Sequence, residues 1–154
     1  MLAIVLVVML AVLAAGGIVL WTRLAGANTR RIADAPDGEL QDLFRGGVLG
    51  KNVITSGTLV RLEFFEWGIR LRGTVISRWV VPTWEARYEE LAIAELVTLP
   101  ASRIAVWFRL RGADPHTIGF LSDRSSQILP VLERRGVPVN RSVTRIRRVD
   151  ELYD

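Results

Sequence analysis

The chain of 154 residues contains no cysteine. This absence excludes disulfide bonds, thiolate nucleophiles and thiolate metal sites, and it is compatible with a reducing compartment. Histidine and lysine are nearly absent as well, because His116 and Lys51 are the only ones. Arginine therefore carries almost all of the positive charge, and the formal net charge is +4.

The scarcity of histidine and lysine leaves few groups for catalysis. A nucleophile needs a base within hydrogen-bond reach, and His116 lies in a predicted turn while Lys51 stands alone. Glu89 and Glu90 are adjacent, so in an extended segment they point to opposite faces. The sequence also lacks a glycine-rich phosphate loop and the ligand spacing of a zinc site. We expect no enzymatic activity, no metal and no cofactor.

Charged side chains are missing altogether from residues 1–22, MLAIVLVVMLAVLAAGGIVLWT, and the first one is Arg23. At about 1.5 Å of rise per residue, a helix of this length crosses a hydrocarbon core of about 30 Å. Tryptophan side chains are enriched at the membrane–water interface, and arginines are common just outside it. We therefore predict a single transmembrane helix over residues 1–22, with Trp21 and Arg23 at the membrane interface.

Positive charges follow this span and do not precede it, at Arg23, Arg30 and Arg31. The positive-inside rule then predicts a single-pass protein of the cell membrane, with its N-terminus outside and its domain in the cytoplasm. A cleaved secretory signal is the alternative, because residues 24–27 resemble a cleavage site. The apolar run is longer than the usual 7–15 residues or so of a signal peptide, and no basic residue precedes it.

Residues 23–47 are interpreted as a juxtamembrane linker. Pro36 and Gly38 break regular structure there, and residues 39–44 predict only a short helix that ends at Gly46. The acidic residues are too sparse to indicate a metal site.

From Val48 onward, apolar residues recur at every second position, as in half-buried strands. The pattern is clearest at 58–65 and at 103–110, where Phe108 is expected to face the core and Trp107 to face outward. Residues 84–97 fit either a strand or a helix. The other expected elements are a turn at 66–68 and strands at 69–73, 74–79 and 117–121.

Near the C-terminus the spacing of the apolar residues changes, and those of 128–132 fall at helical intervals. Residues 122–123 offer an N-cap and Gly136 a stop. Pro130 requires either a helix start near Ser126 or a kink.

This order predicts an α+β fold that is mostly β. A small antiparallel β barrel or sandwich is covered by one C-terminal capping helix and follows the N-terminal transmembrane helix. The predicted boundaries are 1–22 for the membrane span, 23–47 for the linker, 48–139 for the β domain with its helix, and 140–154 for a tail that is first basic and then acidic.

Three parts of the sequence together resemble a bacterial pleckstrin-homology-like (PH-like) domain. They are the hairpin LVRLEFFEWGIRLRG at 59–73, the element WEARYEEL at 84–91, and the strand at 118–120 followed by the helix and Val137-Pro138-Val139. The resemblance is one of order and spacing. It implies that 84–97 is strand, turn and strand, and that the domain binds and does not catalyse. The first hairpin loop, which is basic in phosphoinositide-binding members, is here the short acidic segment 66–68.

A five-stranded oligonucleotide-binding-type barrel behind a membrane span is the alternative fold. It is similar to the membrane partners of stomatin-like proteins, and it implies an accessory subunit of a membrane hydrolase or transporter. The predicted terminal helix argues against it.

The C-terminal part carries a cluster of arginines with no acidic residue between Glu133 and Asp150. Near an anionic leaflet, each such residue contributes about 1 kcal/mol. Nucleic acid is not an expected partner, because aromatic residues are not interleaved with the basic ones and the tail ends acidic. The candidate contacts for anionic lipid are Arg134, Arg135, Arg141, Arg145, Arg147 and Arg148.

Three tryptophans that are expected to face outward, Trp67, Trp79 and Trp107, form a candidate partner patch. The leading hypothesis is a non-catalytic, membrane-anchored binding or scaffold module that presents a PH-like domain to a protein partner in a larger membrane complex. The tether would raise the effective concentration of the domain near such a partner. The alternative is a sensor of anionic lipid that uses the arginine cluster.

Overall fold

The structure is a computed structural model, and it describes residues 30–36, 38–50, 53–55, 57–75, 77, 78, 81, 83–100, 103–112, 117–147 and 152. These residues form nine strands, one α-helix and one 3-10 turn, which is labelled η1. In chain order the elements are β1 (Asp42–Gly50), β2 (Val53–Ile54), β3 (Val60–Phe64), β4 (Gly68–Gly73), β5 (Trp84–Arg87), η1 (Tyr88–Glu90), β6 (Leu91–Leu99), β7 (Arg103–Leu110), β8 (Ile118–Leu121), α2 (Ser125–Arg134) and β9 (Val139–Arg145).

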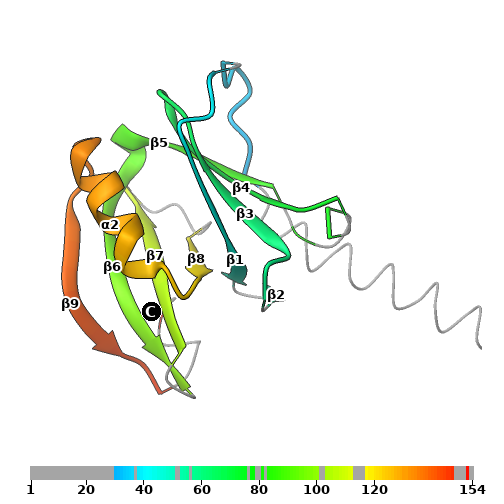
Figure 1. Ribbon diagram of the computed structural model, residues 1–154. Helices are drawn as coiled ribbons and strands as arrows, with labels where there is room; N and C mark the ends of the chain where they lie inside the picture. The colour runs from blue at the N-terminus through cyan, green and yellow to red at the C-terminus, as the bar shows by residue number, and fades with distance from the viewer. Residues whose placement is uncertain are drawn as a thin grey trace, which may run out of the picture.

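The strands follow one path, β5-β4-β3-β1-β8-β7-β6-β9, and β2 pairs with β1 (Figure 1). Strand β1 belongs to two parts of this path, because its residues 42–46 pair with β3 and its residues 47–49 pair with β8. We call β5, β4, β3 and the first part of β1 the first sheet, and the rest of the path the second sheet. Neighbouring strands are antiparallel, except that β9 runs parallel to β6.

Gly46 allows β1 to pass from one sheet to the other. A Cβ atom at this position would lie 2.0 Å from the carbonyl oxygen of Leu121 and 2.8 Å from the ring of Phe120. Only a residue without a side chain permits such a close approach of two backbones. The glycine pair that sequence analysis interpreted as a helix end is therefore the point where β1 changes partners.

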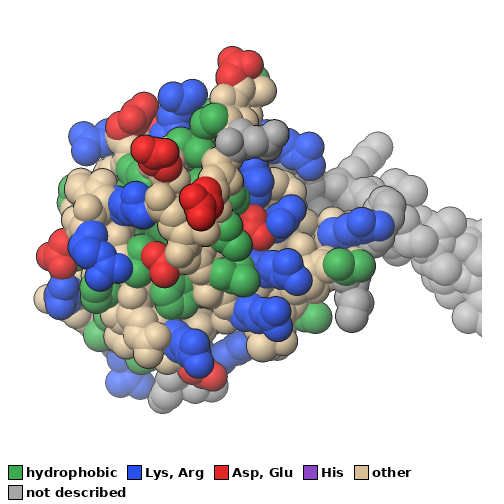
Figure 2. Space-filling view, turned by 45° about the horizontal axis from the view of Figure 1, so that its top comes forward, with side chains coloured by type: hydrophobic (Ala, Val, Ile, Leu, Met, Phe, Trp, Pro, Cys, Tyr) green, Lys and Arg blue, Asp and Glu red, His purple; other side chains and the backbone are tan. Residues whose placement is uncertain are grey.

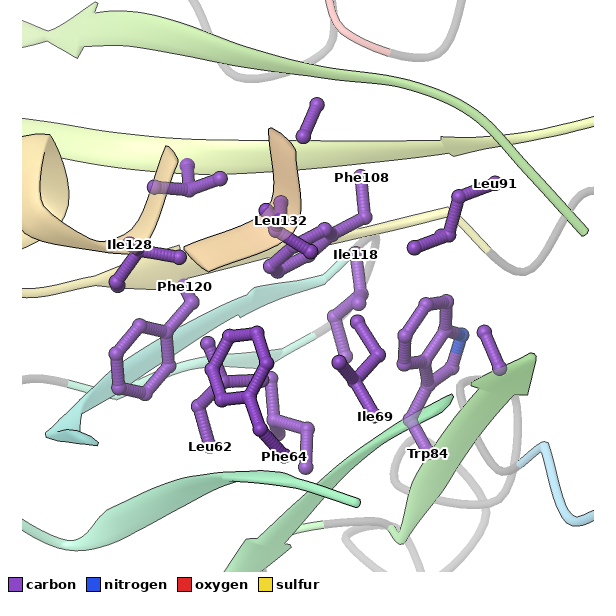
Figure 3. Close-up of a cluster of buried hydrophobic side chains, with 14 of the residues drawn as sticks. Leu62, Phe64, Ile69, Trp84, Leu91, Phe108, Ile118, Phe120, Ile128 and Leu132 are labelled. Carbon is purple, nitrogen blue, oxygen red and sulfur yellow. The ribbon is translucent and has the colours of Figure 1, made fainter. Parts of the chain in front are cut away.

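The main core lies between the two sheets and beneath α2. The alternate residues of β3 point inward, and the aromatic rings of Trp84 from the first sheet and Phe108 from the second lie 6.0 Å apart (Figure 3). Helix α2 adds the buried side chains of Ile128 and Leu132 to the same cluster. Full burial of each of these large apolar side chains stabilises the fold by about 1.5–3 kcal/mol.

The end of α2 confirms the prediction for Gly136, which has a φ of +77°. The N–H of Gly136 donates to the carbonyl of Glu133 at 3.0 Å, and the N–H of Val137 donates to that of Leu132 at 3.1 Å. This pair of bonds is a Schellman motif. The N-cap predicted at 122–123 is displaced to Arg124, because the helix begins at Ser125. Pro130 lies inside the helix.

The predicted linker and helix at its end are wrong where the structure describes them. Strand β1 begins at Asp42, and Phe44 packs edge-on against Phe64 at 5.8 Å between ring centroids. Earlier still, the N–H of Arg30 donates to the carbonyl of Thr83 at 3.1 Å. The cross-strand partners of residues 42–46 on β3, which are distant in sequence, outweigh the weak local helix propensity.

Two further expectations are corrected at the other boundaries. The described residues of 74–79 form turns and not a strand, and the N–H of Ser77 donates to the carbonyl of Thr74 at 3.0 Å. Residues 140–145 of the predicted tail belong to strand β9, so the sheet continues beyond Val139. For residues 84–97, the strand, turn and strand implied by the resemblance are confirmed as β5, η1 and β6.

Trp107 is also corrected, because its side chain is fully buried and does not face solvent. It belongs to a second cluster, which we call the outer cluster, on the face of the second sheet that points away from the main core. The members of the outer cluster are Leu49, Val97, Leu99, Ala105, Trp107, Leu121, Ile146 and Leu152. The expected inward position of Phe108 is confirmed.

The predicted membrane span at 1–22, with Trp21 and Arg23, lies outside the described residues, as do Trp79 and Arg148. Within the described part of the chain, no helix has the length and apolar character that crossing a membrane requires. The transmembrane helix therefore stays a prediction from sequence.

Candidate functional site: an arginine-lined groove

A groove of about 820 Å³ opens where β1 bends, between the start of β7 and the start of α2. Its walls come from segments far apart in sequence, which the strand order brings together. Its lining residues include Leu43, Phe44, Arg45, Arg103, Ile104 and Arg124.

Three arginines give the groove its charge. Arg45 comes from β1, Arg103 begins β7, and Arg124 precedes α2, and all three are exposed. None of them forms an ion pair with another residue in the described ranges. Asp123 is the single acidic residue among the described lining, so the groove favours an anionic ligand.

Apolar side chains lie beside these charges. Leu43 is 40% exposed and Ile104 is 43% exposed, although both belong to strands. Deeper in the groove, Leu96 and Leu121 are buried. Binding sites commonly combine an apolar lining with a few polar groups that orient the ligand. A ligand with both acidic and apolar groups fits this arrangement.

The hydroxyls nearest to the helix start are occupied by backbone carbonyls. Ser125 Oγ donates to the carbonyl of Ser122 at 2.6 Å, and Ser122 Oγ donates to that of Arg45 at 3.2 Å. These bonds fix the loop before α2 against β1. They leave the guanidinium groups as the main polar groups for a ligand.

The outer face of the first sheet carries an ion-pair network under residues 30–41. Arg70 Nε lies 2.6 Å from Glu85 Oε1, and Arg72 Nη2 lies 2.9 Å from Glu63 Oε1. Glu85 also accepts the backbone N–H of Ile32 at 3.0 Å. Glu85 therefore holds the segment before β1 against the sheet. Glu63 is buried with its Oε1 on Arg72, and its Oε2 has no partner in the described part of the chain.

A second network surrounds η1. Burial of Glu90 opposes its ionisation, but hydrogen bonds from the Arg30 side chain at 2.7 Å and from the Arg87 N–H at 2.7 Å outweigh it and lower the pKa of Glu90. Burial raises the pKa of Tyr88 to about 12, and its hydroxyl donates to the carbonyl of Phe65 at 2.7 Å. Both groups therefore keep one charge state near neutral pH and act as structural ties.

The arginines predicted as lipid contacts differ in their surroundings where the structure describes them. Arg141 Nη2 lies 2.5 Å from Glu133 Oε2, and the Arg135 guanidinium lies over the Tyr88 ring at 5.8 Å from its centroid. Arg134 is exposed in the last turn of α2, and Arg145 is exposed at the end of β9. Arg147 follows β9.

The predicted tryptophan patch is not an exposed surface as far as the structure describes it. Trp107 is buried in the outer cluster. Trp67 is half-buried and stacks on Phe65, with ring centroids 5.5 Å apart. Bulky aromatic residues at outward strand positions were interpreted as solvent-facing, whereas chain segments outside the sheets cover them.

Sequence reasoning missed Arg45, Arg103 and Arg124. Arg45 lay inside the expected linker, and only the pairing of β1 with β3 and β8 places it beside the other two. Arg61, Arg70 and Arg72 alternate with buried apolar residues along the hairpin of β3 and β4, so strand periodicity alone indicates that they face outward. Within the described residues, no group of three or more His, Cys, Asp or Glu side chains is arranged to hold a metal ion.

Comparison with known proteins gives no relative by sequence, because no family model and no curated protein matches the chain. Two solved structures are similar in fold. The first, described as the Vps36 N-terminal PH domain, has 8% identity and a TM-score of 0.47, over 64% of this chain and 78% of that one. The second, described as the structure of the Spt16D Pob3N heterodimer, has 12% identity and a TM-score of 0.43, over 68% of this chain and 53% of that one.

Proposed function

We propose that this protein is a non-catalytic, membrane-anchored binding module. Its PH-like domain, composed of two sheets and one capping helix, would be presented at the cytoplasmic face of the membrane to a protein partner in a larger membrane complex. The partner would bind in the arginine-lined groove.

The groove itself is the observation that carries this proposal. It places three exposed arginines without ion partners among the described residues next to the exposed side chains of Leu43 and Ile104. Solvated charges and exposed apolar side chains at these positions add little to the stability of the domain itself. An acidic and apolar segment of another protein would complement both features.

The uncharged run at 1–22 supports the membrane tether, and the arginines that follow it support a cytoplasmic domain. The described chain begins at Arg30 on the edge strand β5. Residues 23–29 reach at most about 25 Å when fully extended. The domain would therefore stay close to the bilayer, and weak contacts with a membrane protein would suffice.

Anionic lipid is the competing ligand, with the exposed arginines of α2 and β9 as contacts. Its support is weaker, because Arg141 already has an acidic partner. A role as accessory subunit with an oligonucleotide-binding-type barrel has less support still, since helix α2 packs into the core as the PH-like interpretation requires.

Crosslinking of the full-length protein in its native membranes, followed by affinity capture and mass spectrometry, tests the proposal. Two triple variants are compared, each of which removes three positive charges. The groove variant is Arg45→Gln, Arg103→Gln and Arg124→Gln, and the control is Arg134→Gln, Arg141→Gln and Arg145→Gln. We expect one membrane protein in near-stoichiometric amount with the parent and with the control, and about tenfold less with the groove variant.

Equal capture by the groove variant would refute the groove as the binding site. Capture of lipid without any protein, lost only in the control variant, would make the bilayer the ligand and the arginines of α2 and β9 the site.

A further inference from the structure

Three arginines stand opposite one another on adjacent strands of the first sheet. The strand register pairs Arg45 of β1 with Arg61 of β3, and Arg61 with Arg72 of β4. We call these three residues the cationic row. All three positions point away from the main core, since the alternate residues Leu62 and Leu71 point into it.

The neighbouring row of the same face is built in the opposite way. There the register pairs Glu63 with Arg70 and Arg70 with Glu85, so that the charges alternate across β3, β4 and β5. Opposite charges on facing cross-strand positions stabilise a sheet, and like charges destabilise it. The sheet therefore contains one row that is arranged for its own stability and one that is not.

The cationic row also lacks enough counter-charge. Glu63 lies 2.9 Å from Arg72 and is the one acidic side chain among the described residues that pairs with a member of the row. Arg61 Nε is buried and has no acceptor in the described part of the chain, and Arg45 has no ion partner there. A buried donor without an acceptor lowers the stability of the fold, so Arg61, like Arg45, is not placed there for the stability of the sheet.

The row is accessible and continuous with the groove. The Arg45 side chain is exposed, the Arg72 side chain is 48% exposed, and Arg45 also lines the groove. Figure 2 shows basic side chains across the visible face, with fewer acidic side chains among them on the half where Figure 1 places β3 and β4. The groove and the row therefore form one cationic surface that bends around β1.

We infer that the cationic row binds an acidic segment of the protein partner, whose carboxylates complete the coordination of Arg45 and Arg61. The inference rests on the proposed function and names the chemistry of the partner. Strands are spaced about 4.8 Å apart, so the three side chains of the row span about 10 Å across β1, β3 and β4, which suits several carboxylates of one chain. Leu43 lies on β1 two residues before Arg45, and an apolar side chain of the same segment would cover it.

A peptide-binding experiment tests the inference on the full-length protein in uncharged detergent. The probe is a fluorescent peptide of alternating Glu and Leu, and the control probe alternates Gln and Leu. We expect the acidic probe to bind in a salt-dependent manner. The double variant Arg45→Gln, Arg61→Gln should weaken binding about fivefold to tenfold and flatten the salt dependence.

The matched control is Arg134→Gln, Arg145→Gln, which removes two exposed charges from α2 and β9 and should bind like the parent. Equal binding of the two probes, or equal loss in both double variants, would overturn the inference. Displacement of the fluorescent probe by micelles that contain phosphatidylserine, but not by unlabelled acidic peptide, would assign the row to lipid. That result would also overturn the inference.

Thermal unfolding gives a second readout that needs no ligand. Arg45→Gln removes one of two like charges in register, so the melting temperature of the full-length protein should rise by about 1–4 °C at low salt. A fall in melting temperature would show that Arg45 has a structural role and would count against the inference. Failure to capture a partner from membranes, with intact row-dependent binding of the acidic probe, would refute the proposed function and leave this inference standing.

Discussion

Phe108 and Trp107 are neighbours on β7, and they show how differently the two apolar clusters of this protein are built. Phe108 points into the main core, between two sheets and a helix, where Trp84 lies opposite it. Trp107 points to the other face of the same strand, where the outer cluster is closed by Ile146 and Leu152. Both side chains are fully buried.

The difference lies in what covers each face. The main core is formed by strands in which apolar and polar residues alternate. The sequence of each strand therefore predicts which of its faces is buried. The outer cluster depends on residues that follow β9, far from Trp107 in the sequence. A strand can therefore be buried on a face that its own sequence pattern does not mark as inward.

The largest expected effect is at the main core. Phe108→Ala should destabilise the protein by about 3–5 kcal/mol, because removal of the buried ring leaves a cavity inside the main core. Denaturant unfolding of the full-length protein, followed by circular dichroism, measures this loss. Ile104→Ala is the control, since Ile104 shares the inward side of β7 but is 43% exposed, and its loss should stay below about 1 kcal/mol. A similar loss in both variants would show that the inner face of β7 is not the centre of the core.

Strand periodicity accounts for the part of the fold that sequence could predict. It placed Phe108 inward, and the resemblance to PH-like domains resolved 84–97 into two strands around η1. It failed at β1, whose glycine pair and acidic neighbours obscure a strand that is fixed by its partners β3 and β8. It failed at Trp107 because a distant segment covers that residue.

The candidate site was harder to predict for the same reason. Arg61 and Arg72 flank a short hairpin turn, so their opposition follows from local register and could have been read from the sequence. Arg45, Arg103 and Arg124 come from three elements that only the tertiary arrangement brings together. The sequence of no single segment predicts that these three arginines lie in one groove.

An intermediate effect is expected at Gly119, which faces the outer cluster. A Cβ atom there would lie 2.7 Å from Trp107 Cε3 and 3.3 Å from Leu49 Cβ. Because a buried indole cannot move freely, Gly119→Ala should destabilise the protein by about 1–3 kcal/mol. In a Trp107→Leu background most of this loss should disappear, which a double-mutant cycle by denaturant unfolding measures. Equal losses in both backgrounds would mean that Trp107 does not fill the space above Gly119.

The smallest of the three effects is expected where the outer cluster is closed. Leu152 is only 4% exposed, but it belongs to the outer cluster, which has fewer members than the main core. Leu152→Ala should therefore cost about 1–2 kcal/mol, below the usual range for a leucine inside a core. Val143→Ala on β9 is the matched control, because Val143 is 51% exposed and should lose less than about 0.5 kcal/mol. Hydrogen exchange at the amides of β7 gives a local readout: faster exchange in Leu152→Ala than in Val143→Ala would show that the C-terminal segment protects the outer face of that strand. Identical exchange in the two variants would show that the strand is held by the main core alone, and that the two faces of β7 are less alike than their equal burial indicates.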